Sequence, residues 1–419
     1  MKFNKWTMGL AAVGVVSLAS AARADETKMD RVNTAISNTT LSGYVDTSAM
    51  WQLGSQHGNP YNQQTGTYLP EPQYTPGYVH GDGFNLDAVD ITLDKPMDES
   101  PWASGYHVEL MTGPDSVGDG YVRQAYLALR TPIGNSGIDW KVGVFDTIIG
   151  YESSSDPLNP NFTRSYGWAL EPTTHTGILG TYKVNDMFSI SAGVANSNRG
   201  NASNGSTTPG SGPYETQKAY MGSFTFTAPD GAGFMKGATL SLGAINADNG
   251  SSAYSGYNGY FRGYTSLYAG VTVPTPITAL KLGAAFDFVD QHNQSGGYGG
   301  MGDSSVWNVG LYANWQINDK ASFNLRGEYL NDNGSGPYYG SVTGSYYPYN
   351  YVQNNNAEEL TATLQYNLWA NVISRVEFRW DHVEHGKAFD NTTQSNYYGE
   401  YATAHDNAFL LAVNLIYQF

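Results

Sequence analysis

Residues 408–419, AFLLAVNLIYQF, form the last segment of the chain. Every second position from Phe409 to Phe419 carries Phe, Leu, Val, Leu, Tyr or Phe, which makes one apolar face that ends in aromatic residues. This alternation predicts a β-strand with one apolar side. A strand of this kind that stops on an aromatic residue is typical of the closing strand of an outer-membrane β-barrel. Tyr417 and Phe419 would then lie in the interfacial girdle and act as the barrel-closing signal.

A second segment, residues 371–383, alternates charged with apolar residues. One face carries four charged residues in a row, and the other carries Val, Phe and Trp. A soluble β-sandwich core has no place for such a row, whereas a strand between lipid and a water-filled lumen does. The four charged residues are Arg375, Glu377, Arg379 and Asp381.

The N-terminus has the pattern of a secretory signal peptide. Lys2 and Lys5 precede the short apolar run 8–18, and Ala22 and Ala24 frame a small-x-small cleavage site. The apolar run is too short for a membrane-spanning helix. We therefore expect residues 1–24 to be removed, residues 25–38 to form a polar periplasmic segment, and residues 39–419 to form the barrel.

The composition excludes several classes of protein. The chain has 419 residues, a net charge of −16 and no cysteine, so disulfides, thiol nucleophiles and Cys-based metal sites are ruled out. The acidic charge argues against a nucleic-acid partner. The 32 Tyr and 49 Gly against 21 Lys plus Arg, with no long apolar run after the signal, suit an all-β barrel whose lumen is polar and whose rings lie at the interfaces.

The rest of the chain repeats alternating segments of about ten residues, joined by alternately long and short connections. Short joints carry Pro, Gly, Asn and Asp, as turns do, whereas long joints are rich in Gly, Ser, Asn and Tyr, as outer loops are. This rhythm predicts a transmembrane antiparallel barrel of about sixteen strands. The expected strands are 41–53, 84–94, 104–113, 121–130, 138–150, 174–184, 188–197, 217–228, 237–246, 259–273, 278–290, 305–317, 321–330, 358–367, 371–383 and 407–419.

Several motifs resemble the OmpL-like β-barrel porin family of Gram-negative bacteria. The resemblance covers most of the chain in layout and is specific mainly between Gly43 and Gly177. It implies an outer-membrane barrel with passive diffusion, but it identifies no solute. The motifs are Ser42 to Asp46, Phe84 to Leu86 with Lys95 and Pro96, Gly143 to Phe145, Ile149 to Glu152, Asn161 to Tyr166 and Pro172 to Gly177.

The third outer loop, residues 151–173, is the candidate constriction, since the corresponding loop of many sixteen-stranded porins folds inward. We expect loop charges to face wall arginines across the channel and to create a transverse field, because rings or ladders of charge set selectivity in pores. The alternative is pairing within the wall, for example of Arg326 with Glu328 or of Arg375 with Glu377. The candidate pore-lining residues are Glu152, Asp156, Arg164 and Glu171 of the loop, and Arg130, Arg262, Arg326, Arg375 and Arg379 of the wall.

The sequence therefore predicts a porin, a water-filled channel in the outer membrane for small hydrophilic solutes or ions. It would need no cofactor and no metal, would contact outer-membrane lipid, and by analogy would form a homotrimer. Four alternatives stay open: a barrel-borne hydrolase using His175 and a nearby serine, a plugged binding or adhesion barrel, a carbohydrate-selective porin using the tyrosines between 338 and 351, and a soluble secreted β-protein. The strand that ends at Phe419 argues against the last of these. Residues 381–385, DHVEH, form a weaker metal-site candidate, because His382 and Glu384 share a strand face but His385 does not.

Overall fold

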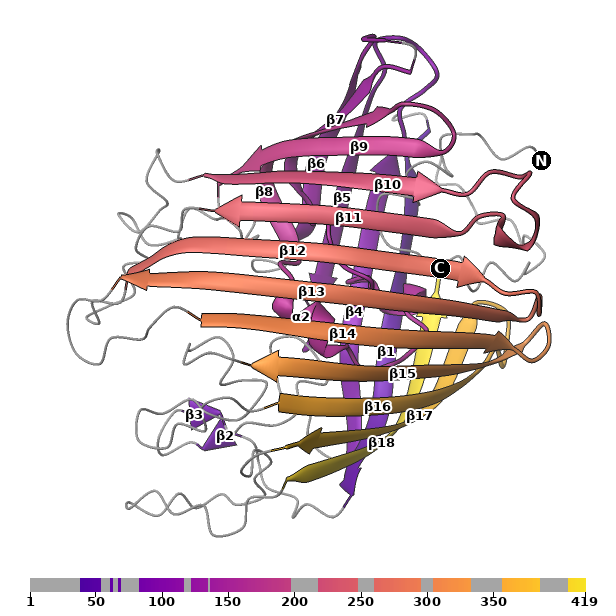
Figure 1. Cartoon of the computed structure of the whole chain (residues 1–419). Coiled ribbons are helices and arrows are strands. Elements are labelled where there is room, and N and C mark those ends of the chain that lie inside the picture. Colours follow the sequence, from indigo (N-terminus) through magenta and orange to yellow (C-terminus); the bar gives the residue numbers. More distant parts are fainter. Residues whose placement is uncertain are drawn as a thin grey trace.

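The computed structural model is a closed barrel of sixteen antiparallel strands, so the predicted fold class is confirmed. Neighbours along the chain are neighbours in the wall, and the ring closes between the first and the last strand (Figure 1). The strands are β1 (Thr40–Leu53), β4 (Gly83–Lys95), β5 (Ser104–Thr112), β6 (Val122–Thr131), β7 (Ile138–Asp146), β8 (Thr174–Lys183), β9 (Phe188–Ala195), β10 (Ala219–Thr227), β11 (Thr239–Ala247), β12 (Tyr260–Pro274), β13 (Leu280–Gln294), β14 (Ser304–Gln316), β15 (Ala321–Asp332), β16 (Asn356–Tyr366), β17 (Val372–Val383) and β18 (Asn407–Gln418).

The structure describes residues 38–53, 61–62, 67–68, 83–116, 122–134, 136–196, 218–247, 260–294, 304–332, 356–384 and 406–419. Two short strands outside the barrel, β2 (Tyr61–Asn62) and β3 (Thr67–Tyr68), pair with each other. The expected signal peptide, the tyrosines between 338 and 351, His385 and most of the long outer joints lie outside the described residues. Within the described part, no helix is long and apolar enough to cross a membrane.

The barrel closes where β18 pairs with β1. Tyr417 lies opposite Val45 in this pairing. Beyond the last paired strand residue, the Phe419 amide donates to the Gly43 carbonyl at 3.0 Å, and the Gly43 amide donates to the Phe419 carbonyl at 3.1 Å. A Cβ on residue 43 would lie 2.7 Å from Phe419 Cζ, so glycine lets the terminal ring pack against the first strand. The terminal residue is thus part of the seam itself.

The two faces of the wall follow the alternation of the sequence. On β18, Phe409, Leu415 and Tyr417 are 38–50% exposed on the outer surface, whereas Leu410 and Asn414 are fully buried on the inner one. The charged face of β17 points inward in the same way, with Arg375 and Arg379 almost fully buried. Apolar residues toward lipid and polar residues toward the interior are the arrangement of a membrane-spanning barrel.

The predicted strand 138–150 is too long, because β7 ends at Asp146. The chain leaves the wall after that residue and enters the barrel, where Ile148 and Ile149 are buried. Gly150 has φ +118°, in the region that favours glycine, and it completes the change of direction. The apolar residues that follow Asp146 were predicted to continue the strand, but they leave the wall and pack inside the barrel.

Candidate functional site

Residues 147–173, which we name the inner segment, connect β7 to β8 and fold into the lumen. The segment contains a 3₁₀ turn, η2 (Asp156–Leu158), and a short helix, α2 (Tyr166–Leu170), seen inside the wall in Figure 1. Ser165 caps α2, since its Oγ accepts a hydrogen bond from the Trp168 amide at 2.9 Å. The helix packs against β13 and β14. The candidate constriction loop therefore lies inside the barrel, and its role as a constriction stays a prediction.

The inner segment shares a hydrophobic core with the wall. Tyr151 stacks on Tyr312 of β14 with ring centroids 3.9 Å apart. Tyr166 and Leu170 of α2 belong to the same buried cluster, together with Tyr268 of β12. Burial of this apolar surface holds the segment against β12–β14 on one side of the lumen. The sequence did not predict this core, because the tyrosine rings were expected at the membrane interfaces and the lumen was expected to be polar.

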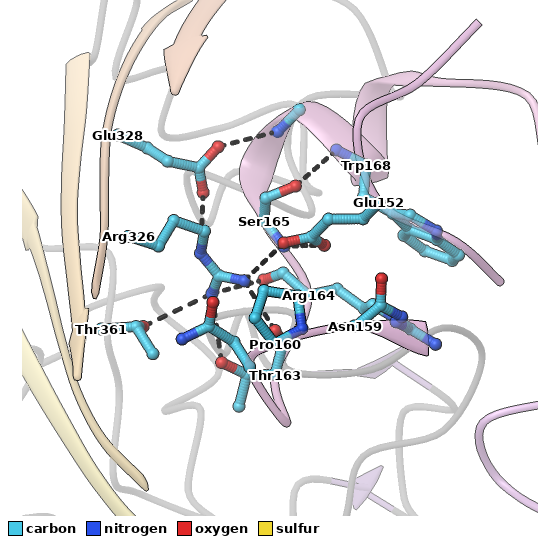
Figure 2. A network of polar contacts seen from close by, with 12 residues as sticks. Glu152, Asn159, Pro160, Thr163, Arg164, Ser165, Trp168, Arg326, Glu328 and Thr361 are labelled. Atoms are coloured by element: carbon cyan, nitrogen blue, oxygen red, sulfur yellow. Dashed lines mark hydrogen bonds and ion pairs between the residues drawn. The ribbon is translucent and has the colours of Figure 1, made fainter. Parts of the chain in front are cut away.

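Arg326 of β15 joins the wall to the inner segment (Figure 2). Its guanidinium donates to Glu152 Oε1 and to the Thr163 carbonyl, both at 2.7 Å, and to the Arg164 carbonyl at 3.2 Å. The same group donates to Glu359 of the wall at 3.1 Å. Arg326 is fully buried, so all of these contacts lie away from water. A planar group with five donors suits this bridging role.

Two further arginines hold the segment from β17. Arg375 donates to the Asp156 carbonyl at 3.2 Å, and Arg379 donates to the Arg164 carbonyl at 2.6 Å. Arg379 also pairs with Asp381 at 2.7 Å within its own strand. Both guanidinium groups bind carbonyl oxygens of the loop backbone, so they fix the path of the chain.

Carboxylates bind the backbone amides of the segment. Glu377 of β17 accepts hydrogen bonds from the amides of Phe162 and Thr163 at 2.6 and 2.9 Å. Glu328 of β15 accepts one from the amide of Tyr166 at 2.6 Å. We name the wall residues Arg326, Glu328, Arg375, Glu377 and Arg379 the clamp. The clamp satisfies donors and acceptors of a loop that would otherwise be buried without partners.

The structure brings together most of the predicted site residues. Glu152, Asp156 and Arg164 all lie at the clamp, and Arg164 pairs with Asp156. Both predicted modes of pairing occur at Arg326, since Glu152 belongs to the loop and Glu359 to the wall. These charges are buried at the contact between loop and wall, so their direct effect on a solute stays a prediction.

Three predicted residues lie elsewhere. Arg130 of β6 pairs with Asp139 of β7 at 2.6 Å, apart from the clamp. Glu171 follows α2 and faces Asp287 of β13. Arg262 is in β12, but its side chain lies outside the described residues.

A row of ionisable side chains crosses the opposite wall, from β4 to β7, and we name it the ladder. His107 lies 3.0 Å from Asp94 and 3.4 Å from Glu109. Arg123 pairs with Glu109, and its Nη1 lies 2.7 Å from Asp146 Oδ1. The ends of the ladder reach water, because the side chains of Asp94 and Asp146 are 40% and 37% exposed, whereas that of Arg123 is 4% exposed.

The alternation of the sequence did not identify Arg123, the partner of Glu109, as an inward-facing charge. The register of β5 with β6 shifts between Glu109 and Leu110, which face Gln124 and Val122. Arg123 is therefore the extra residue of a β-bulge, and its side chain joins Glu109 on the inner side. A single inserted residue exchanges the inward and outward faces of the strand beyond it. One alternating pattern applied to the whole segment therefore assigns some residues to the wrong face.

The residues of the weaker enzyme and metal hypotheses have structural partners. His175 is fully buried, and its Nε2 lies 3.1 Å from Thr147 Oγ1. His382 Nδ1 lies 3.1 Å from Asn407 Oδ1, while Asp381 is bound to Arg379 on the opposite strand face. Within the described ranges, no group of three or more His, Cys, Asp or Glu residues is arranged to hold a metal.

Comparisons with known proteins agree with this architecture. The model of a family described as "Putative beta-barrel porin-2, OmpL-like" matches residues 38–419. None of the curated proteins matches the sequence.

Three solved structures share the fold at low sequence identity. The anion-selective porin from Comamonas acidovorans is 12% identical with a TM-score of 0.57, covering 91% of this chain and 99% of its own. The trimer form of OmpT from Vibrio cholerae is 13% identical with a TM-score of 0.56, covering 91% and 99%. The channel DcaP of Acinetobacter baumannii is 13% identical with a TM-score of 0.55, covering 91% and 97%.

Proposed function

Because the chain belongs to the OmpL-like β-barrel porin-2 family and is an outer-membrane channel, we propose that small hydrophilic solutes cross it between the inner segment and the ladder wall. The asymmetry of the lumen carries this proposal. The clamp arginines are almost fully buried beneath the inner segment, whereas ladder carboxylates on the other side are partly exposed. Water and solute then have a polar path on the ladder side.

In this mechanism selection depends on size and charge, with no covalent chemistry and no cofactor. The inner segment narrows the lumen, and the clamp and the hydrophobic core keep its position constant. The exposed charge of the ladder is mainly carboxylate, since Asp94 and Asp146 reach water while Arg123 does not. We therefore expect a preference for cations, as in pores lined by acidic side chains.

The same proposal covers export and assembly. Residues 1–24 would direct the chain to the outer membrane and be removed, and the folded barrels would associate as homotrimers. The trimer form of a similar Vibrio cholerae barrel supports the second point.

Planar-bilayer conductance of the refolded protein tests the channel directly. We expect stable ohmic steps, and a reversal potential under a KCl gradient whose sign reports cation preference. A folded, heat-modifiable barrel without conductance would contradict the open path and would favour a plugged binding barrel.

Substitution of the exposed ladder carboxylates tests the path. The variant Asp94→Asn/Asp146→Asn should lower the K⁺/Cl⁻ permeability ratio about two- to fivefold, because a unit charge 4 Å away contributes about 1 kcal/mol in water. The matched control is Asp230→Asn, which removes a carboxylate with a 91% exposed side chain from the connection between β10 and β11. An equal effect of the two changes, or no effect of the ladder variant, would place the path elsewhere.

A further inference from the structure

Beneath α2, the wall carries buried oxygen atoms without hydrogen-bond partners. Asp287 of β13 and Asn308 of β14 lie directly opposite each other, and the two residues are 2% and 0% exposed. Neither carboxylate oxygen of Asp287 accepts a hydrogen bond from an N–H group or a hydroxyl group of the described residues, and the same holds for Asn308 Oδ1. Asn308 Nδ2 donates to Glu328 at 2.8 Å, which fixes the orientation of the amide. Buried polar atoms of this kind call for a ligand or a proton.

Glu171 brings a second carboxyl group to the same place. It follows α2, where its amide donates to the Trp168 carbonyl at 3.3 Å, and its carboxyl lies within hydrogen-bonding reach of Asp287. Two carboxylates in contact need a shared proton or a shared cation between them.

The available cations are already engaged. Arg326, on the neighbouring strand β15, is bound to Glu152 and Glu359. Arg379 is bound to Asp381, and Arg164 to Asp156. The negative charge of Glu171 and Asp287 therefore has no arginine partner among the described ion pairs.

The number of buried oxygen atoms that need a partner distinguishes a bound metal ion from a shared proton. A proton shared between Glu171 and Asp287 satisfies one acceptor and leaves a second Asp287 oxygen and Asn308 Oδ1 without a donor. A metal ion can accept several oxygen ligands at once. Carboxylate and amide oxygens, with no nitrogen or sulfur, are the donor set that Ca²⁺ prefers.

We propose that Glu171, Asp287 and Asn308 bind a Ca²⁺ ion, which ties the C-terminal end of α2 to strands β13 and β14. The amide oxygen and water would complete the ligand shell that two carboxylates begin. Gly167 of α2 supports this assignment, because a Cβ there would lie 2.5 Å from Asp287 Oδ2 and would displace the carboxylate. The proposal goes beyond channel function and does not depend on the selectivity of the pore.

Equilibrium dialysis of the folded, full barrel with ⁴⁵Ca²⁺, after treatment with EDTA, tests the site. We expect one high-affinity ion per chain, and at least a tenfold loss of affinity in Asp287→Asn and in Glu171→Gln. Asn308→Asp keeps an oxygen ligand and should retain binding, whereas Asn308→Leu should weaken it. Asp230→Asn, with its exposed carboxylate, should bind as the wild type does.

A second readout separates the ion from the shared proton. Ca²⁺ should raise the thermal unfolding temperature of the wild type and of Asn308→Asp, but not that of Asp287→Asn, since a ligand stabilises only the state that binds it. Absence of high-affinity binding, or binding that Asp287→Asn and Glu171→Gln leave unchanged, would overturn the proposal. An infrared band of a protonated carboxylic acid that persists in saturating Ca²⁺ and disappears in Glu171→Gln would also overturn it, in favour of the shared proton.

Discussion

Replacement of Arg326 by alanine should release the inner segment and destabilise the folded barrel by about 3–5 kcal/mol, the range for removal of one partner from a buried ion pair. The change leaves Glu152 buried without its counter-charge, leaves Glu359 with only the more distant Arg379 at 3.9 Å, and removes the donors to the carbonyls of Thr163 and Arg164. Urea unfolding in lipid vesicles, followed by tryptophan fluorescence, measures the decrease in the free energy of unfolding. Single-channel recordings should show larger current noise, because the segment that narrows the lumen loses its central contact.

Lys236→Ala is the control for removal of a cation. Lys236 pairs with Asp230, with side chains 61% and 91% exposed, so its loss should cost no more than about 1 kcal/mol. The double variant Arg326→Ala/Glu152→Gln should recover part of the stability, because it removes one of the stranded carboxylates. An Arg326→Ala barrel as stable and as quiet as the wild type would refute the assignment of Arg326 to the clamp.

Deletion of Phe419 should strongly reduce the yield of closed barrel. The deletion removes both hydrogen bonds between Phe419 and Gly43, each contributing about 1 kcal/mol, and it removes the ring that packs at the seam. The fraction of heat-modifiable, protease-resistant protein after refolding into vesicles measures closure. We expect a loss of severalfold or more, since the pairing of β1 with β18 that closes the sheet loses two hydrogen bonds and its terminal ring.

Phe409→Ala is the matched control for the Phe419 deletion. Phe409 is an aromatic residue on the same outer face, 38% exposed, at the other end of β18. The Phe409→Ala variant loses apolar area but no backbone hydrogen bond. Its effect on refolding should therefore be smaller than that of the Phe419 deletion. An equal loss in both variants would mean that apolar area, and not the seam, controls closure.

The alternation of apolar and polar residues predicted the strands and the two faces of the wall, because this alternation is a local property of the sequence. The segment 371–383 differs from β17 by one residue at its start, and its four charged residues all face inward. The segment 407–419 differs from β18 by one residue at its end, and its apolar face from Phe409 to Phe419 points outward. In a strand, side chains point to opposite faces in turn, so the residues of one strand suffice to assign both faces.

The prediction from alternation was wrong where the backbone departs from a regular strand. Arg123 faces inward because of the bulge opposite Glu109, and β7 ends at Asp146 because the chain turns into the lumen. Both events depend on the fit of a neighbouring strand or of the barrel interior. Neither can be assigned from the residues of the segment concerned alone.

The amino-acid sequence thus determined the class of fold, the number of strands, the faces of the wall and the loop that enters the lumen. It also identified Glu152 and Arg326 as interior charges, but not as partners. Their contact joins residues 174 positions apart, and it forms because β15 and the inner segment meet inside the closed barrel. Which charges are buried in the clamp and which reach water along the ladder follows from that packing, since burial and pairing depend on neighbours that the folded chain alone brings together.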